Sequence, residues 1–141
     1  MNADTPDAAA QAGVSLRLGP RHSAPRAARK LAYDLCQQAG STVLVDNAAL
    51  VAGELVRTSI HQTRAAVTLQ LTCEPGQVTL RVRDGGSGSP IRDDKTDAGA
   101  VRCWDIVRRL AVTWGFAEQQ SGREMWATLR DERQRLARIA A

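Results

Sequence analysis

Two groups of polar residues in this sequence have types and spacings that could support chemistry. The first is a loop: Asp84 ends an alternating segment and is followed by "GGSGS", which places Gly86 and Gly88 two residues apart. Glycine adopts backbone conformations that tight turns need, and its missing side chain also lets the backbone come close to a ligand. These residues alone leave two interpretations open, a plain turn and a loop that holds a nucleotide.

The second group lies on one side of an expected helix. Glu54, Thr58 and Gln62 follow one another at four-residue spacing, and His61 lies beside them. Residues four apart share a helix face, so the three polar side chains form a stripe. A carboxylate in such a stripe could accept a proton from a hydroxyl or a water molecule, or it could be a solvated or ion-paired helix acid. We expect His61 to be a helix-surface or hydrogen-bonding residue rather than a ligand.

The elements that must position these residues can be read from hydrophobic periodicity and turn signals. Ala27, Leu31, Leu35 and Cys36 mark the apolar positions of the first helix, and the second helix is the best defined. The expected elements are a strand in 13–20, helices at 23–40 and from 41 or 46 to 62, strands at 65–73 and 77–84, a helix at 101–114, and strands at 115–120 and 123–130.

This order predicts an α+β fold. Helices that precede and separate antiparallel hairpins favour a two-layer sandwich, with the helices packed on one face of a mixed or antiparallel sheet. We expect a disordered tail at 1–13, one domain at 14–130 and a terminal helix at 131–141. The segment 85–100 is long for a connector, which is more typical of a lid or a binding loop.

Composition narrows the function classes. The net charge is +4, but basic and acidic residues are interleaved and aromatic residues make up only 4%, which argues against direct nucleic-acid binding. No apolar run approaches the ~20 residues that span a bilayer, so we expect no membrane association. Cys36, Cys73 and Cys103 fit neither a disulfide framework nor a zinc pattern, which indicates reduced thiols and a cytoplasmic protein.

The ordered set of helix acid, Asp-x-Gly-x-Gly loop and later helix resembles the Bergerat-type (GHKL) ATPase fold. Within that fold it is similar to the small anti-sigma regulatory factors that act as serine/threonine kinases. "ELVRTSIHQT" resembles the family's helical box, "VRDGGSGSP" its adenine-binding loop, "CWDIVRRLAVTWG" its third helix and "GREMWATL" its final strand. The resemblance covers roughly residues 14–130.

The resemblance implies a role for each matching residue. Asp84 would accept a hydrogen bond from the adenine amino group, and Gly86 and Gly88 would let the backbone approach the base and ribose. Glu54 would be the catalytic carboxylate. Thr58 stands where the family has an asparagine that coordinates Mg²⁺, and its hydroxyl is shorter than that amide.

The sequence also departs from the family at the expected mouth of the third helix. The family has Gly-x-Gly there, whereas this chain has Val101 and Cys103 on either side of Arg102, which keeps the usual basic position. Gly99 could compensate if the register shifts by two residues. On the last strand, Glu124 replaces a threonine near the adenine pocket. Because phosphoryl transfer depends on metal and phosphate positioning, we expect ATP or ADP and Mg²⁺ to bind weakly or not at all.

The sequence therefore leads to one principal hypothesis and one alternative. The principal hypothesis is an anti-sigma-like transcription regulator that binds a sigma factor, an anti-anti-sigma protein or both, and that pairs as a homodimer, as the family does. The alternative is an active ATP- and Mg²⁺-dependent kinase that phosphorylates an anti-anti-sigma factor. Both rest on Asp84 and Glu54 lining one shared cavity.

Overall fold

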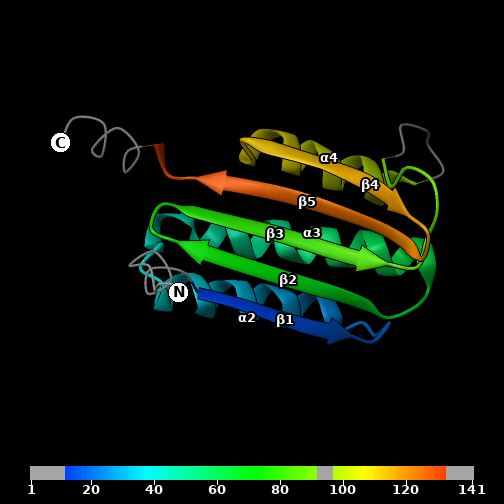
Figure 1. Ribbon diagram of the computed structural model, residues 1–141, viewed down its shortest axis with the longest axis horizontal. Coiled ribbons are helices and arrows are strands. Elements are labelled where there is room, and N and C mark those ends of the chain that lie inside the picture. Colours follow the sequence, from blue (N-terminus) through cyan, green and yellow to red (C-terminus); the bar gives the residue numbers. More distant parts are fainter. Residues whose placement is uncertain (1–11, 92–96, 133–141) are drawn as a thin grey trace, which may run out of the picture.

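The protein is a two-layer α+β sandwich, as the computed structural model shows (Figure 1). The structure describes residues 12–91 and 97–132. One five-stranded sheet has the order β1-β2-β3-β5-β4, and every neighbouring pair is antiparallel. The helices lie together behind one face of this sheet. The expected α+β class is therefore confirmed. The sequence left a mixed or an antiparallel sheet open, and the sheet is antiparallel.

The bounds of the elements follow from the same structure. The helical layer consists of α2 (Ala24–Gln38), the short 3-10 helix η1 (Thr42–Leu44), α3 (Val45–Thr63) and α4 (Ala98–Leu110). The strands are β1 (Ala12–Leu18), β2 (Val67–Glu74), β3 (Gln77–Asp84), β4 (Thr113–Gln119) and β5 (Gly122–Arg130).

The core lies between the layers, and α3 is its central helix. On α3 the small and apolar side chains are buried, namely Ala48, Val51, Ala52, Leu55 and Ser59, and Ile60 is half-buried. On α2 the expected face is right for Cys36 and wrong for the rest: Ala27 is exposed, and Leu31 and Leu35 are only partly buried. The buried face of α2 consists of small residues at four-residue spacing, namely Ala24, Ala28, Ala32 and Cys36. Small side chains let α2 pack closely against α3, which outweighs the larger hydrophobicity of the leucines.

Both expected hairpins are confirmed. In β2–β3, Glu74 pairs with Gln77 across a turn in which Gly76 has a φ of +79°. In β4–β5, Gln119 pairs with Gly122. Alternate residues of the central strands then face the helices and are buried: Leu69, Leu71 and Cys73 on β2, Val78, Leu80 and Val82 on β3, and Met125, Ala127 and Leu129 on β5.

The third long helix begins earlier than expected and also ends earlier. It runs over Ala98–Leu110 rather than 101–114, and β4 begins at Thr113. The Asp97 side chain caps the helix by accepting a hydrogen bond from the Ala100 N–H. Trp114 therefore belongs to a strand, from which it packs against Trp104 of α4 with ring centroids 5.6 Å apart. The sequence prediction followed apolar spacing and missed this cap.

The chain ends are only partly covered by the described residues. Strand β1 begins at Ala12, so the expected tail at 1–13 is wrong for its last two residues. Residues 1–11 and most of the expected terminal helix at 131–141 lie outside the described residues, as does the loop segment 92–96. Within the ranges that are described, no helix combines the length and the apolar character needed to cross a membrane.

Candidate functional site

The expected adenine-binding carboxylate, Asp84, is held by an arginine of the same chain. Asp84 is the last residue of β3, and the sheet register places it opposite Arg123 of β5. Arg123 Nε lies 2.9 Å from Asp84 Oδ1 and 3.2 Å from Oδ2. The Arg123 and Asp84 side chains are 1% and 0% exposed. This is a fully buried ion pair, which persists only when the remaining polar atoms also find partners.

Those remaining partners are present on the carboxylate side. The Ser59 hydroxyl of α3 donates to Asp84 Oδ2, and the Gly86 N–H donates to Oδ1 at 2.8 Å. Both carboxylate oxygens therefore already accept hydrogen bonds from the protein. An adenine amino group would have to displace one of these donors to reach Asp84.

The Arg123 guanidinium also holds the loop that follows β3. Its Nη2 donates to Gln62 Oε1 at 2.7 Å, and its Nη1 donates to the Gly88 carbonyl at 3.2 Å. Gln62 Nε2 in turn donates to the Pro90 carbonyl at 3.0 Å, which also accepts from Trp104 Nε1 at 3.3 Å. The loop is thus tied to α3, α4 and β5 by side chains that reach its backbone.

The loop glycines have a structural role in this arrangement. A Cβ atom at Gly86 would lie 3.0 Å from both Arg123 Nε and Asp84 Oδ1. Gly88 has a φ of +77°, a left-handed conformation that favours glycine. The space left by the missing Gly86 side chain is therefore occupied by Arg123 and Asp84 of the chain itself.

The expected catalytic carboxylate, Glu54, is also paired. Arg57 Nη2 donates to Glu54 Oε1 at 2.7 Å, and Arg102 Nε lies 3.8 Å from the same oxygen. The hydrogen bond from Arg57 to Glu54 is the main cause of a raised Arg57 pKa. The Arg102 side chain is 70% exposed, so its contact with Glu54 is peripheral and screened by solvent.

The expected metal position offers little to a cation. Thr58 Oγ1 is buried and has no hydrogen-bond partner of ordinary geometry. Burial raises the pKa of the nearby Cys103 thiol to about 11, and the hydroxyl of Thr58 partly opposes that rise. A thiol held protonated next to a single hydroxyl is a poor magnesium site, since Mg²⁺ prefers carboxylate oxygens and water. Within residues 12–91 and 97–132, no three His, Cys, Asp or Glu side chains are placed to hold a metal.

The N-terminus of α4 carries a carboxylate where the family would place phosphates. Asp97 Oδ1 accepts from the Ala100 N–H at 2.9 Å, and Asp97 Oδ2 accepts from Gln62 Nε2 at 3.2 Å. Gly99 lies in the first turn of the helix, and its carbonyl accepts from Arg57 Nη2 at 3.2 Å. The negative charge of Asp97 takes the favourable position at the positive end of the helix dipole. A phosphate would meet this carboxylate, so the residues present do not fit a bound Mg²⁺–ATP.

Asp84 and Glu54 share no direct hydrogen-bond partner in the described part of the chain. The partners of Asp84 are Arg123, Ser59 and Gly86, and none of them contacts Glu54. Ser59 follows Glu54 by five residues, which is about 7.5 Å along the helix axis and about 140° around it. The hollow of about 450 Å³ beside the Asp84 backbone has Arg17, Arg83 and Gly122 in its lining, but not Glu54.

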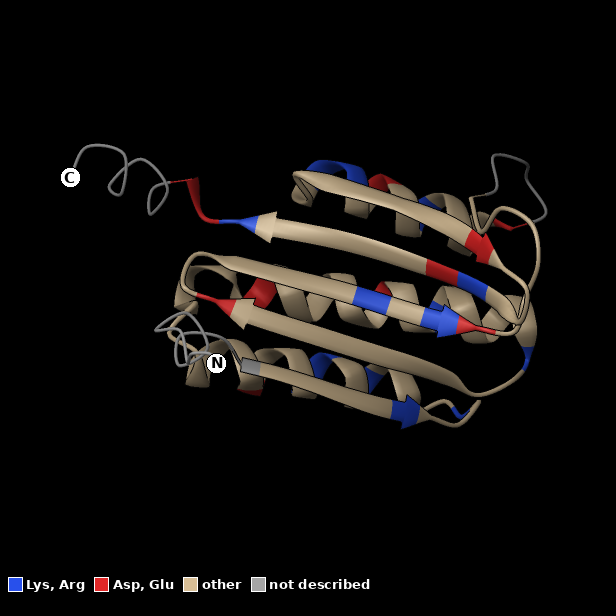
Figure 2. Cartoon of the chain, in the orientation of Figure 1, with Lys and Arg blue, Asp and Glu red and all other residues tan. Residues whose placement is uncertain are grey.

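Glu124 is not in the pocket, contrary to the expectation. It lies on the face of the sheet opposite α2, α3 and α4 in Figure 1, and pairs with Arg83 at 2.6 Å and Arg81 at 3.1 Å. Figure 2 shows these basic and acidic positions side by side on β3 and β5. Burial raises the pKa of Glu124, but the hydrogen bonds and charges of the two arginines outweigh it, and the pKa is lowered overall.

Sequence reasoning missed Arg123, the central residue of the network. Strand alternation could have found it, because Met125, Ala127 and Leu129 are apolar and share its parity in "REMWATL". An arginine on the buried face of a strand needs a partner of opposite charge, but the alternation does not show which residue supplies it.

No protein-family model matches this sequence, and no curated protein matches it either.

Proposed function

We propose that this protein is a transcription regulator that acts by binding other proteins, with a fold related to the anti-sigma kinases and a nucleotide pocket filled by its own side chains. The support for the fold is the order of the resembling segments, together with the observed α+β layering. The observation that carries the loss of nucleotide binding is the buried Asp84–Arg123 pair.

Nucleotide binding would require several favourable contacts to break. Arg123 would have to leave Asp84, and removing one partner of a buried ion pair costs about 3–5 kcal/mol. It would also leave Gln62 and the Gly88 carbonyl, which anchor the loop. At the other end, Asp97 would oppose a triphosphate by charge. A nucleotide would have to offset all of these costs before binding with any net affinity.

The partners proposed are a sigma factor, an anti-anti-sigma protein or both, and the active form is a homodimer. These partner classes rest on the sequence resemblance alone. A regulator of this kind needs no chemistry at Glu54, which here forms an ion pair with Arg57.

An active kinase is the second candidate, and one observation favours it. Thr58 Oγ1 is a buried oxygen without a hydrogen-bond partner of ordinary geometry among the described residues, so it could ligate an ion. The kinase would need Asp97 and Arg123 to swing away when the nucleotide enters.

Isothermal titration with ATP and Mg²⁺ separates the two candidates. We expect no binding heat from the wild-type protein. Micromolar, Mg²⁺-dependent binding would overturn the filled-pocket proposal and favour the kinase.

Pull-down with purified sigma factors encoded in the same genome tests the partner class. Capture of one of them supports the proposal, and failure with all of them contradicts it.

A further inference from the structure

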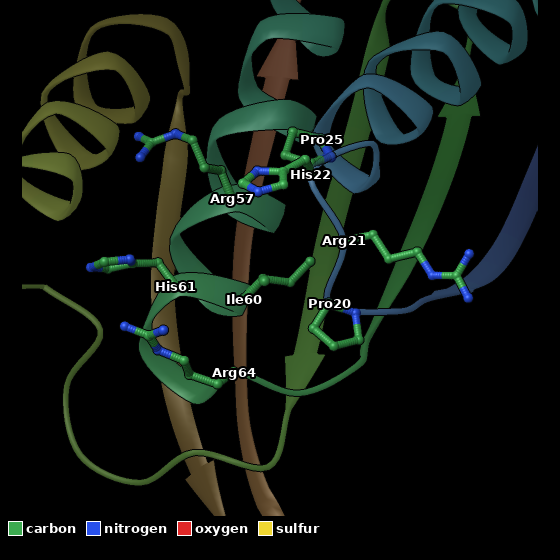
Figure 3. Close-up of a pocket in the computed structure, with 8 residues that line it drawn as sticks. All are labelled: Pro20, Arg21, His22, Pro25, Arg57, Ile60, His61 and Arg64. Atoms are coloured by element: carbon green, nitrogen blue, oxygen red, sulfur yellow. The ribbon is translucent and has the colours of Figure 1, made fainter.

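A second hollow lies on the helical layer, away from Asp84 (Figure 3). It has a volume of about 740 Å³ and is formed where the chain enters α2 and by the C-terminal half of α3. Five of its lining residues carry basic side chains: Arg21, His22, Arg57, His61 and Arg64. Pro20, Pro25 and Ile60 supply its apolar surface.

The basic side chains of this hollow are largely uncompensated. Among the residues that the structure describes, no acidic side chain lines it. In the described part of the chain, Arg57 pairs with Glu54, while Arg21 and Arg64 make no ion pair. Arg21, His22, His61 and Arg64 are exposed. Other arginines of the fold, such as those on β3, have a carboxylate beside them. A cluster of one sign in a concave surface focuses the field and attracts a partner of the opposite sign.

The arrangement of the side chains shows what kind of anion would fit. In Figure 3, Ile60 and Pro20 lie centrally, Arg57, His61 and Arg64 extend to one side, and Arg21 extends to the other. A bare phosphate would leave the apolar centre uncovered. A peptide with an apolar side chain between acidic residues would cover the centre and meet cations on both sides.

We propose that this hollow binds an acidic segment of a protein partner, with an apolar side chain seated over Ile60 and Pro20 and flanking Asp or Glu side chains facing the arginines. The inference rests on the proposed function in assuming a protein partner, and it adds the chemistry by which that partner is recognised. Arginine suits this role because its guanidinium pairs with a carboxylate through two parallel hydrogen bonds.

The test uses a fluorescein-labelled synthetic peptide with one leucine between pairs of glutamates, followed by fluorescence anisotropy with the full chain. We expect binding that weakens between about 0.1 M and about 1 M salt, as the Debye length falls from ~10 Å to ~3 Å. Replacing the leucine by serine should weaken binding, because the apolar centre is then uncovered. Replacing the glutamates by lysines should abolish it.

Two charge-matched protein variants locate the site. The double variant Arg21→Glu/Arg64→Glu should lose roughly tenfold or more in affinity, since like charges then oppose the peptide. The control Arg17→Glu/Arg109→Glu changes two exposed arginines on β1 and α4, outside this hollow, by the same total charge. At a salt concentration that screens the general effect of the changed net charge, this control should bind the peptide with an affinity within about twofold of the wild type. Circular dichroism of both variants checks that they remain folded.

Three outcomes would overturn the proposal: no peptide binding by the wild type, an equal loss in both double variants, or full competition by inorganic phosphate. The last would indicate a small-anion site instead. These results are independent of nucleotide binding. If the protein binds Mg²⁺–ATP, the filled-pocket proposal fails while the peptide result stands, and the reverse also holds.

Discussion

At the scale of single residues, Arg123 has the largest consequences. This one side chain, which is 1% exposed, neutralises Asp84, holds Gln62 and anchors the Gly88 carbonyl. A buried arginine of this kind contributes little net energy while its partners are present. Its removal is different, because it leaves a carboxylate buried without a cation.

The variant Arg123→Met should therefore be strongly destabilised. We expect the free energy of unfolding, measured by urea titration, to fall by about 3–5 kcal/mol. The control is Arg81→Met, whose side chain is 43% exposed and shares Glu124 with Arg83. That change should cost about 0–1 kcal/mol.

A second variant identifies the cause of the loss. In Asp84→Asn/Arg123→Met no charge remains buried at the site, so much of the stability should return. If Arg123→Met costs no more than Arg81→Met, the buried pair does not have the importance assigned to it here.

At the scale of elements, the start of α4 decides what its N-terminus can bind. Asp97 satisfies the Ala100 N–H and places a negative charge at the end of the helix that favours one. The helix thus begins three residues before the position suggested by apolar spacing. Gly99, and not Val101, lies in its first turn.

Removal of this cap should weaken α4. We expect Asp97→Ala to lower the free energy of unfolding by about 0.5–2 kcal/mol, measured by thermal or urea unfolding. Asp105 is a matched control on the same helix, since it is exposed and its contact with Arg108 is 4.0 Å long. Asp105→Ala should change stability by less than about 0.5 kcal/mol. Equal effects of the two changes would contradict the capping role.

The pairing of β3 with β5 predicts a pH dependence through Glu124. Its pKa in the folded protein is lowered from the ordinary value of 4.5, because Arg83 and Arg81 together outweigh its burial. A lowered folded pKa stabilises the protein above the unfolded pKa, and this contribution is lost as the pH falls through the folded value. The stability difference between wild type and Glu124→Gln should therefore be constant at neutral pH and decline as the pH falls below 4.5.

Urea unfolding over a pH series measures this difference. In a background with Arg81→Gln and Arg83→Gln, the decline should shrink or reverse, since burial alone raises the pKa of the carboxyl group. A decline unchanged by the loss of both arginines would show that other acids cause it.

At the scale of the whole molecule, all three cysteines are buried between the layers. Cys36 Sγ and Cys73 Sγ lie 3.4 Å apart and join α2 to β2. The hydrogen bond with Cys73, followed by burial, raises the pKa of Cys36. Reagents can therefore reach these thiols only when the two layers separate.

Ellman's reagent should thus react slowly with the native protein and promptly with all three thiols in urea. The native rate should rise in Arg123→Met, because a less stable fold opens more often. Rapid reaction of the wild-type protein at neutral pH would contradict the burial of the thiols.

The sequence determined the local elements because their signals are local. Apolar periodicity and turn residues predicted α2, α3, β2, β3 and β5, and the layering followed from their order. The predictions failed where tertiary contacts decide. The face of α2 was wrong because close packing against α3 selects alanines over leucines, and Trp114 joined a strand because β5 offers it a partner in Ala127.

The candidate site shows the same difference between what the sequence determines and what only tertiary contacts decide. From the sequence, Asp84 and Glu54 were identifiable as polar residues in structured surroundings, and both are buried and paired. The pairing of Asp84 was not identifiable, since Arg123 lies 39 residues from it and meets it only through the β3–β5 register. Types and spacing along the chain show which side chains could do chemistry. Only the folded structure decides whether those side chains face a ligand or each other, because that depends on contacts between distant segments.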